Sequence, residues 1–180
     1  MQSETESPTK EQQQILERVK DRVLQELYLE KSDEYLDRKQ SSVQQKEEPL
    51  RGFIHGPPGT GKSRLIQFIR RFFIEALEWE HGVTFMFVAF QNRVAYAMGG
   101  TTLHAGGDVA VGGPGSRKLG HLDIDVLFTR NQHLRWVLID EVGMIGDELL
   151  GSFESNLTDQ SLFTRSDMTR QNVLLVGTVP

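Results

Sequence analysis

Residues 56–63 have the types and the spacing of a loop that binds phosphate. The segment reads GPPGTGKS and fits the pattern G-x-x-x-x-G-K-[ST], in which glycines let backbone N–H groups turn inward around a phosphate. Lys62 supplies a mobile positive charge for the β- and γ-phosphates of a nucleotide, and the Ser63 hydroxyl is a ligand for Mg²⁺. A plain Gly-Pro turn is the structural alternative. The predicted nucleotide-binding residues are Gly56, Pro57, Pro58, Gly59, Thr60, Gly61, Lys62 and Ser63.

Two adjacent acids, Asp140 and Glu141, end the apolar run 136–139 and form a second candidate for chemistry. A phosphate loop works with a carboxylate at the end of a neighbouring strand, which orients the metal ion through water. Asp140 is placed to orient Mg²⁺, and Glu141 to polarise the attacking water as general base. An apolar strand ending in Asp-Glu is also common without a catalytic role. With the loop, the pair predicts a catalytic set of Lys62, Asp140 and Glu141.

Short apolar runs alternate with helical stretches from residue 51 onward, and these are the elements that must position the loop and the acids. Nearly continuous apolar runs are typical of strands that helices cover on both faces. The alternation predicts an α/β fold with a parallel sheet and crossover helices. The expected strands are RGFIH (51–55), VTFMFVAF (83–90), RWVLID (135–140) and NVLLVG (172–177). The helix after the phosphate loop has an expected core face of Leu65, Ile66, Ile69, Phe72 and Phe73.

The first 50 residues differ in character from the rest of the chain. Apolar side chains recur every four residues over 8–30 and predict an amphipathic helix. The start signal of this helix is either Ser7 followed by Pro8, or Thr9 with Gln12 in the spacing of a capping box. Residues 31–50 are polar and predict a solvated linker or a loosely packed helix end. We therefore expect an N-terminal helix and linker over 1–50 and an ATPase lobe over 51–180.

Composition excludes several classes of protein. The chain has 180 residues, a net charge of −5 and no cysteine, which rules out disulfides, zinc knuckles and thiol catalysis. The histidines lack metal-ligand spacing. No apolar run has the length of a membrane span or a signal peptide, so we expect an intracellular protein without a membrane partner. Nucleic-acid contacts must rest on local placement, because no strongly basic face is indicated.

Three further stretches point to one family. Residues 89–95 (AFQNRVA) lead into 99–104 (GGTTLH), residues 138–145 (LIDEVGMI) have the form I-D-E-x-x-M, and 173–177 (VLLVG) follow as a strand. With the phosphate loop, these motifs resemble the first motor lobe of a Pif-type DNA helicase, in the RecD-like branch of superfamily 1. The helicase segment of Helitron-type transposons is especially similar. The resemblance covers about residues 9–178 and implies a RecA-like P-loop NTPase domain.

The resemblance implies a lobe that couples ATP hydrolysis to 5′–3′ DNA unwinding, with ATP, Mg²⁺ and single-stranded DNA as ligands. It gives phosphate and Mg²⁺ binding to Lys62 and Ser63, and the metal and water to Asp140 and Glu141. DNA repair, recombination and telomere maintenance are the processes that it implies. We expect a monomer in the nucleus or another DNA-containing compartment.

The resemblance also assigns residues to adenine and DNA. Lys10-Glu11-Gln12 resembles the motif whose glutamine reads the adenine edge, although Gln12 has the alternative of only closing the capping box. Thr102 and His104 lie in the block that faces single-stranded DNA. Phe90-Gln91-Asn92 stands where the family commonly has Pro-Thr-Gly, so Gln91 or Asn92 must replace the threonine that touches a DNA phosphate.

The family's phosphate-sensing glutamine and second lobe, with its arginine finger, have no counterpart before Pro180, so we expect one lobe only. An AAA+ ATPase is one alternative, since it shares the loop, but it places a sensing asparagine at the end of the strand after the acids. Here Asn172 precedes that strand. A non-catalytic nucleotide- or DNA-binding remnant of a transposon helicase is another alternative, against which the intact Lys62, Asp140 and Glu141 argue.

Other features have competing interpretations. The glycine-rich stretch 106–118 is a DNA-contacting loop through Arg117 and Lys118, or a flexible surface connection, which we favour. Trp79 and Trp136 stack on bases or pack in the fold, and packing is favoured. We expect three arginines on the exposed face of the helix after the loop to be solvated: Arg64, Arg70 and Arg71.

Overall fold

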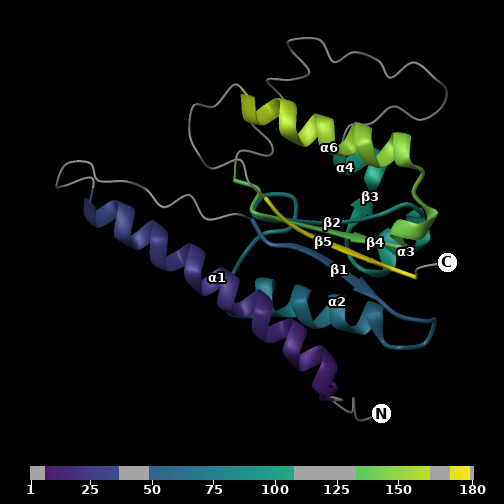
Figure 1. Ribbon diagram of the computed structural model, residues 1–180, viewed down its shortest axis with the longest axis horizontal. Helices are drawn as coiled ribbons and strands as arrows, with labels where there is room; N and C mark the ends of the chain where they lie inside the picture. The colour runs from purple at the N-terminus through teal and green to yellow at the C-terminus, as the bar shows by residue number, and fades with distance from the viewer. Residues whose placement is uncertain (1–6, 37–48, 108–132, 163–170, 179–180) are drawn as a thin grey trace. The chain divides into compact units, whose positions relative to one another are not determined.

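The computed structural model describes residues 7–36, 49–107, 133–162 and 171–178 (Figure 1). The chain divides into two compact units, Met1–Glu47 and Glu48–Pro180. None of the helices in the described ranges combines the length and the apolar character that crossing a membrane requires.

The described residues of the first unit form the helix α1 (Lys10–Leu36). A reciprocal capping box begins it: the Thr9 N–H donates to Gln12 Oε1 at 2.9 Å, and the Gln12 N–H donates to Thr9 Oγ1 at 3.3 Å. Each bond satisfies a backbone donor that the helix end leaves without a partner. The helix runs to residue 36, so the helix-end alternative is correct for 31–36 and the linker alternative is not.

The second unit is built on a five-stranded, entirely parallel sheet. Its strand order is β1-β5-β4-β2-β3. The predicted α/β class is therefore confirmed. The strands are β1 (Arg51–His55), β2 (Phe85–Ala89), β3 (Thr101–Thr102), β4 (Trp136–Asp140) and β5 (Asn172–Gly177).

Strands β1 and β5 have the predicted bounds, whereas β2 and β4 are shorter than the runs 83–90 and 135–140. The short strand β3 was not predicted. It pairs with the last two residues of β2, Val88 and Ala89, and two residues carry too little pattern to be recognised in a sequence.

Helices cover both faces of this sheet, with α2 on one face and α4 and α6 on the other (Figure 1). A single π-helical turn, Phe72–Ala76, extends α2, and a 3₁₀ turn, Val142–Met144, follows β4. The helices in the described residues of this unit are α2 (Lys62–Arg71), α3 (Asn92–Ala97), α4 (Leu103–Gly107) and α6 (Asp147–Leu162).

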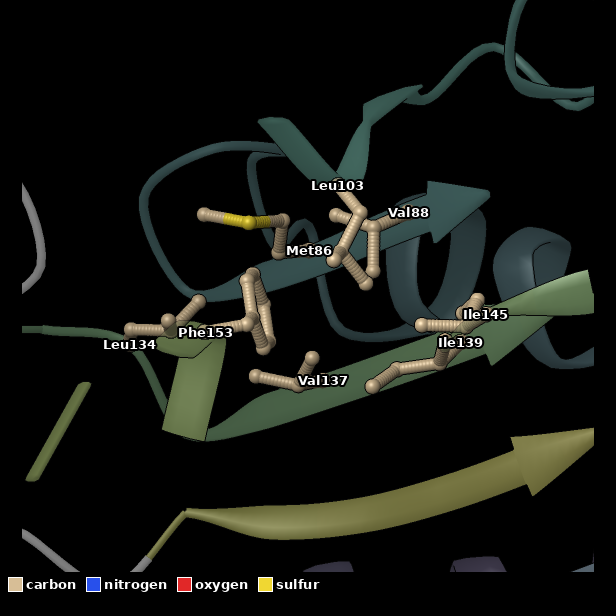
Figure 2. Close-up of a cluster of buried hydrophobic side chains, with 8 residues drawn as sticks. All are labelled: Met86, Val88, Leu103, Leu134, Val137, Ile139, Ile145 and Phe153. Carbon is tan, nitrogen blue, oxygen red and sulfur yellow. The ribbon is translucent and has the colours of Figure 1, made fainter. Parts of the chain in front are cut away.

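One core cluster lies between the sheet and the pair α4–α6. Figure 2 shows the Phe153 ring of α6 between Met86 of β2 and Val137 of β4. Gly106 and Gly107 are buried in α4 against this cluster, so a flexible surface connection is wrong for these two residues. Residues 108–118, with Arg117 and Lys118, lie outside the described residues. The cluster consists of Met86, Val88, Leu103, Leu134, Val137, Ile139, Ile145 and Phe153.

Aromatic rings fill the opposite face of the sheet. The Phe73 ring lies 5.2 Å from Phe85, 5.5 Å from Trp136 and 5.1 Å from Trp79, measured between ring centroids. Trp79 and Trp136 therefore both pack against Phe73 within the fold, as the favoured interpretation predicted. The expected core face of α2 holds for Leu65, Ile66, Ile69 and Phe73, whereas Phe72, the first residue of the π-helical turn, is only half-buried.

The three arginines of α2 have three different surroundings. Arg71 is exposed and pairs with Glu75 at 3.1 Å, and Arg64 lies 5.6 Å from the centre of the Phe68 ring. Arg70 is half-buried, and a Cβ placed on Gly99 would lie 2.8 Å from its guanidinium. Full solvation was therefore the wrong expectation for Arg70, which the turn before β3 covers.

Candidate functional site

The loop at residues 56–63 leaves the carboxyl end of β1 and leads directly into α2. Gly59 and Gly61 have φ values of +82° and +81°, a conformation that glycine adopts without a steric penalty. Thr60 closes a turn in the loop, with its hydroxyl donating to the Pro57 carbonyl at 2.9 Å. This backbone has the curvature of a loop that wraps around an anion.

Lys62 begins α2, and its side chain folds back into the loop. The Nζ atom donates to the Gly56 carbonyl at 2.6 Å and to the Pro57 carbonyl at 3.0 Å. Gly61 caps α2 without a side-chain hydrogen bond, and Ser63 is exposed in the first turn. The ammonium group, the helix N-terminus and the Ser63 hydroxyl therefore lie at one position, which suits the terminal phosphates of a nucleotide.

Asp140 ends β4 and is buried, with 8% of its surface exposed. Burial raises the pKa of its carboxyl, while a hydrogen bond from the Glu141 N–H, 2.8 Å long, and the positive charge of Lys62 act in the opposite direction. Because β1, β5 and β4 run parallel in one sheet, the loop after β1 and the acid at the end of β4 lie at the same edge. Residues far apart in the sequence thus lie at one edge of the sheet, as the motif spacing predicted.

We expected Asp140 to end a strand directly beside the strand that carries the phosphate loop, and this expectation was wrong. Strand β5 pairs with both β1 and β4 and separates them, so β4 is the second strand from the loop. Two strand spacings amount to about 10 Å. A hydrated cation together with phosphate oxygens can span such a gap. A direct bond between Asp140 and a side chain of the loop cannot.

Glu141 has a left-handed backbone, with φ 55° and ψ 39°. This conformation is uncommon for a residue with a side chain and costs about 1–3 kcal/mol. Its Oε2 atom is buried and has no hydrogen-bond partner among the described residues. A buried carboxylate oxygen without a donor is poised to accept a proton or a hydrogen bond from a ligand.

The donor set at this edge fits Mg²⁺. Magnesium prefers oxygen ligands, keeps several of its waters and is held by one or two carboxylates together with substrate phosphates. The Asp140 carboxylate and the Ser63 hydroxyl supply oxygen ligands of this kind. In the described ranges, no three His, Asp or Glu side chains gather into a closed metal cage, and a nucleotide-bound Mg²⁺ does not require one.

The residues predicted to contact DNA lie at the carboxyl ends of β2 and β3. Gln91 and Asn92 begin α3 directly after β2, and the Gln91 amide contacts Met144 Sδ at 3.4 Å. The Thr102 hydroxyl accepts the Ala105 N–H at 3.2 Å and so caps α4. The His104 ring lies 6.1 Å from the ring of Phe90.

Two exposed side chains on this surface were missed as site candidates. Phe90 is 38% exposed and Met144 is 55% exposed. Phe90 directly follows a fully buried strand, and a large aromatic side chain in that position is a signal that the sequence did carry.

Gln12 and Asn172 have structural partners. Gln12 lies in the first unit, where its side-chain oxygen closes the capping box with Thr9. Asn172 is 1% exposed at the amino end of β5, where its Oδ1 accepts the Leu50 N–H at 2.7 Å. The amino end of the strand lies at the opposite edge of the sheet from the phosphate loop, so Asn172 does not reach a nucleotide there.

Comparison with solved structures finds proteins that share the fold described above. No protein-family model matches the sequence, and no curated protein matches it either. Among solved structures, Pif1 helicase from Candida albicans has a TM-score of 0.62 and 18% identity, over 96% of this chain and 33% of that one. Unliganded Pif1 from Bacteroides sp. has a TM-score of 0.58 and 17% identity, over 96% of this chain and 32% of that one.

A third solved structure is Pif1 from Bacteroides in complex with ADP-AlF3 and single-stranded DNA, with a TM-score of 0.56 and 18% identity. It covers 96% of this chain and 32% of that one. The chain thus spans about a third of the length of the Pif1 helicases that it matches. The resemblance predicted from the motifs is confirmed at the level of the fold: this chain has the RecA-like fold found in Pif1 helicases.

Proposed function

We propose that this chain is the N-terminal ATP-binding motor lobe of a Pif-type DNA helicase, which couples ATP hydrolysis to 5′–3′ unwinding. The observation that carries the proposal is the position of Lys62. Its ammonium group lies in a loop curved for phosphate and acts electrostatically on the buried carboxyl of Asp140. Phosphate binding and metal binding therefore converge at one edge of the sheet.

Each residue of this edge has a defined role in the proposal. Lys62 exchanges its carbonyl partners for phosphate oxygens, a replacement of neutral acceptors by charged ones. Ser63 and Asp140 hold Mg²⁺, which neutralises charge on the phosphates when it is bound. Glu141 accepts the proton of the attacking water through its partnerless oxygen.

The nucleic-acid part of the proposal concerns the surface beside this edge. Gln91, Asn92, Thr102 and His104 contact single-stranded DNA. The Bacteroides Pif1 structure, bound to ADP-AlF3 and single-stranded DNA, supports both ligands by likeness of fold. The protein acts as a monomer in the nucleus or another DNA-containing compartment, in repair, recombination or telomere maintenance.

The substitution Lys62→Ala tests the nucleotide site. We expect it to abolish detectable Mg–ATP binding, because it removes the charge that meets the phosphates. Calorimetric titration measures the affinity, and circular dichroism verifies the fold, since Lys62 also ties the loop to two carbonyls.

The matched control is Thr60→Ala, which removes another hydrogen bond to the Pro57 carbonyl but leaves the charge in place. It should weaken Mg–ATP binding by less than tenfold, the equivalent of about 1 kcal/mol for one neutral hydrogen bond. Equal Mg–ATP affinity of the Lys62→Ala variant and the unchanged chain contradicts the proposal.

A further inference from the structure

Met144 is the exposed methionine of the described part of the chain, and the nucleotide site does not use its side chain. Met144 is 55% exposed, whereas Met86 and Met98 are buried, with 0% and 8% of their surfaces exposed. Met1 and Met168 lie outside the described residues. Exposure governs how readily a peroxide reaches a thioether sulfur and converts it to a sulfoxide. The three described methionines should therefore differ in reactivity.

The sulfur of Met144 joins two segments that are far apart in the sequence. The Gln91 Nε2 amide, at the start of α3, donates to Met144 Sδ at 3.4 Å, in the 3₁₀ turn after β4. A thioether sulfur has lone pairs that accept such a bond weakly. An oxygen added to the lone pair that faces Gln91 would occupy the space of this bond. An oxygen added to the other lone pair leaves the sulfur positively polarised, so it no longer attracts an N–H donor.

The turn that contains Met144 also holds Glu141. The Met144 N–H donates to the Glu141 carbonyl at 2.8 Å, and the Ile145 N–H donates to the Val142 carbonyl at 3.0 Å. Glu141 has a left-handed backbone, with φ 55°, and such a conformation persists only where surrounding contacts hold it. Loss of the contact between Gln91 and Met144 removes one restraint on this backbone.

We propose that Met144 is a reversible oxidation site, at which hydrogen peroxide forms a sulfoxide that releases Gln91 and destabilises the turn that holds Glu141. A sulfur lone pair attacks one peroxide oxygen, the S–O bond forms as the O–O bond breaks, and the other oxygen leaves as water with both protons. The sulfur thus loses two electrons to the peroxide. A methionine sulfoxide reductase reverses the step: two thiols supply two electrons, become a disulfide, and the oxygen leaves as water.

The oxidation and its effect on the turn do not depend on the proposed function. Only the consequence for ATP hydrolysis rests on it, since Glu141 is the general base there. In that case oxidation of Met144 slows hydrolysis.

Limited treatment of the chain with hydrogen peroxide, followed by peptide mass mapping, measures oxidation at each methionine separately. We expect Met144 to gain one oxygen before Met86 and Met98. Hydrogen–deuterium exchange of the Met144 backbone N–H, followed by NMR, then reports opening of the turn. Exchange should become about 5-fold faster, the equivalent of losing one neutral hydrogen bond. Treatment with a methionine sulfoxide reductase should restore the original rate.

Met144→Leu is the matched control, because leucine nearly conserves the volume of methionine and has no sulfur. The same peroxide treatment should leave the exchange at residue 144 of this variant unchanged, although the other methionines are still present. Gln91→Ala tests the route of the effect. Its untreated chain should already exchange faster at Met144, and oxidation should add no further acceleration.

Three results overturn the inference: oxidation of Met144 no earlier than of Met86 and Met98, an unchanged exchange rate after oxidation, or the same acceleration by peroxide in Met144→Leu or Gln91→Ala. None of these measurements uses ATP or DNA. Failure of this inference and failure of the proposed function, which the Mg–ATP titration of Lys62→Ala tests, are therefore distinguishable.

Discussion

Asp140 and Glu141 are adjacent in the chain, yet their carboxyl groups have different surroundings. Asp140 accepts the Glu141 N–H and experiences the charge of Lys62, so its ionised form has partners even though burial disfavours it. The Oε2 atom of Glu141 has no donor in the described part of the chain. Two carboxyl groups in unlike environments can take unlike roles, which in the proposed function are metal binding and proton transfer.

Substitution of Glu141 by glutamine separates binding from hydrolysis. Glu141→Gln keeps the shape of the side chain and removes the proton acceptor, so Mg–ATP affinity should stay within a few-fold. In the full-length protein we expect ATP hydrolysis to fall by about 10²- to 10⁴-fold, the usual contribution of a general base. Initial rates of phosphate release measure the effect. Hydrolysis at the parental rate rules out Glu141 as the base.

Substitution of Asp140 by asparagine should stabilise the nucleotide-free chain at neutral pH. Burial raises the pKa of Asp140 in the folded state, so the folded state disfavours the ionised carboxyl. The resulting loss of stability is complete above the raised pKa of the folded state. It disappears as the pH falls below the pKa that Asp140 has in the unfolded state. Asparagine carries no charge and can still accept the Glu141 N–H.

Urea denaturation of both chains across a pH series checks this prediction. The gain in the free energy of unfolding from Asp140→Asn should be largest at neutral pH and shrink as the pH falls through the raised pKa. Asp21→Asn, on the exposed surface of α1, is the matched control and should show no such gain. A pH-independent difference, or a less stable Asp140→Asn variant at neutral pH, contradicts the assignment.

At the scale of elements, short segments complete the sheet and its cover. β2 pairs with β3 only at Val88 and Ala89, and the preceding Phe87 N–H donates instead to His81 Nε2 at 3.0 Å. On the other face of the sheet, α4 packs against α6, where Gly107 meets the ring of Phe153. The His81 side chain thus accepts a backbone N–H of β2, and the absence of a side chain at Gly107 lets α4 pack closely against α6.

The contact between α4 and α6 predicts opposite effects for two Gly→Ala substitutions. Gly107→Ala places a methyl group inside the contact distance of the buried Phe153 ring and should destabilise the fold by about 1–3 kcal/mol. Gly151→Ala, in α6, meets nothing within 4 Å and should stabilise it by about 0.5–1 kcal/mol. Chemical denaturation measures both values. Equal effects of the two substitutions contradict the packing argument.

At the scale of the molecule, the chain corresponds to about a third of the Pif1 helicases with the same fold. Its second unit provides one sheet edge with the loop at residues 56–63 and the acid pair Asp140 and Glu141. Two-lobed helicase motors bind ATP between lobes, and an arginine finger is worth about 10³- to 10⁵-fold in the rate of phosphoryl transfer.

The 180-residue chain alone should therefore bind Mg–ATP weakly and fail to unwind DNA. In the proposed function, one lobe offers one DNA-binding surface, whereas translocation needs two that alternate. DNA binding should be weak and salt-sensitive, with a shallow slope because few phosphates are contacted. A strand-displacement assay on a 5′-tailed duplex with ATP checks this. Robust unwinding by the isolated chain contradicts the single-lobe interpretation.

Local patterns in the sequence were sufficient to predict the phosphate loop and the strands β1 and β5. Glycine spacing and continuous apolar runs act over a few residues, so their structural meaning does not depend on distant parts of the chain. The parallel α/β class follows in the same way from the alternation of strands and helices. The loop conformation and the parallel α/β class could therefore be predicted from residue types and spacing alone, and the nucleotide chemistry of the loop stays a prediction.

Strand order and side-chain partners depended on the tertiary structure. The insertion of β5 between β1 and β4, the cover of Arg70 by Gly99 and the support of Phe90 by His104 all join segments far apart in the chain. Sequence periodicity tells which face of an element is buried but not which element covers it. The residue types at the site were thus determined by the sequence itself, whereas packing between distant segments decided which of them meet.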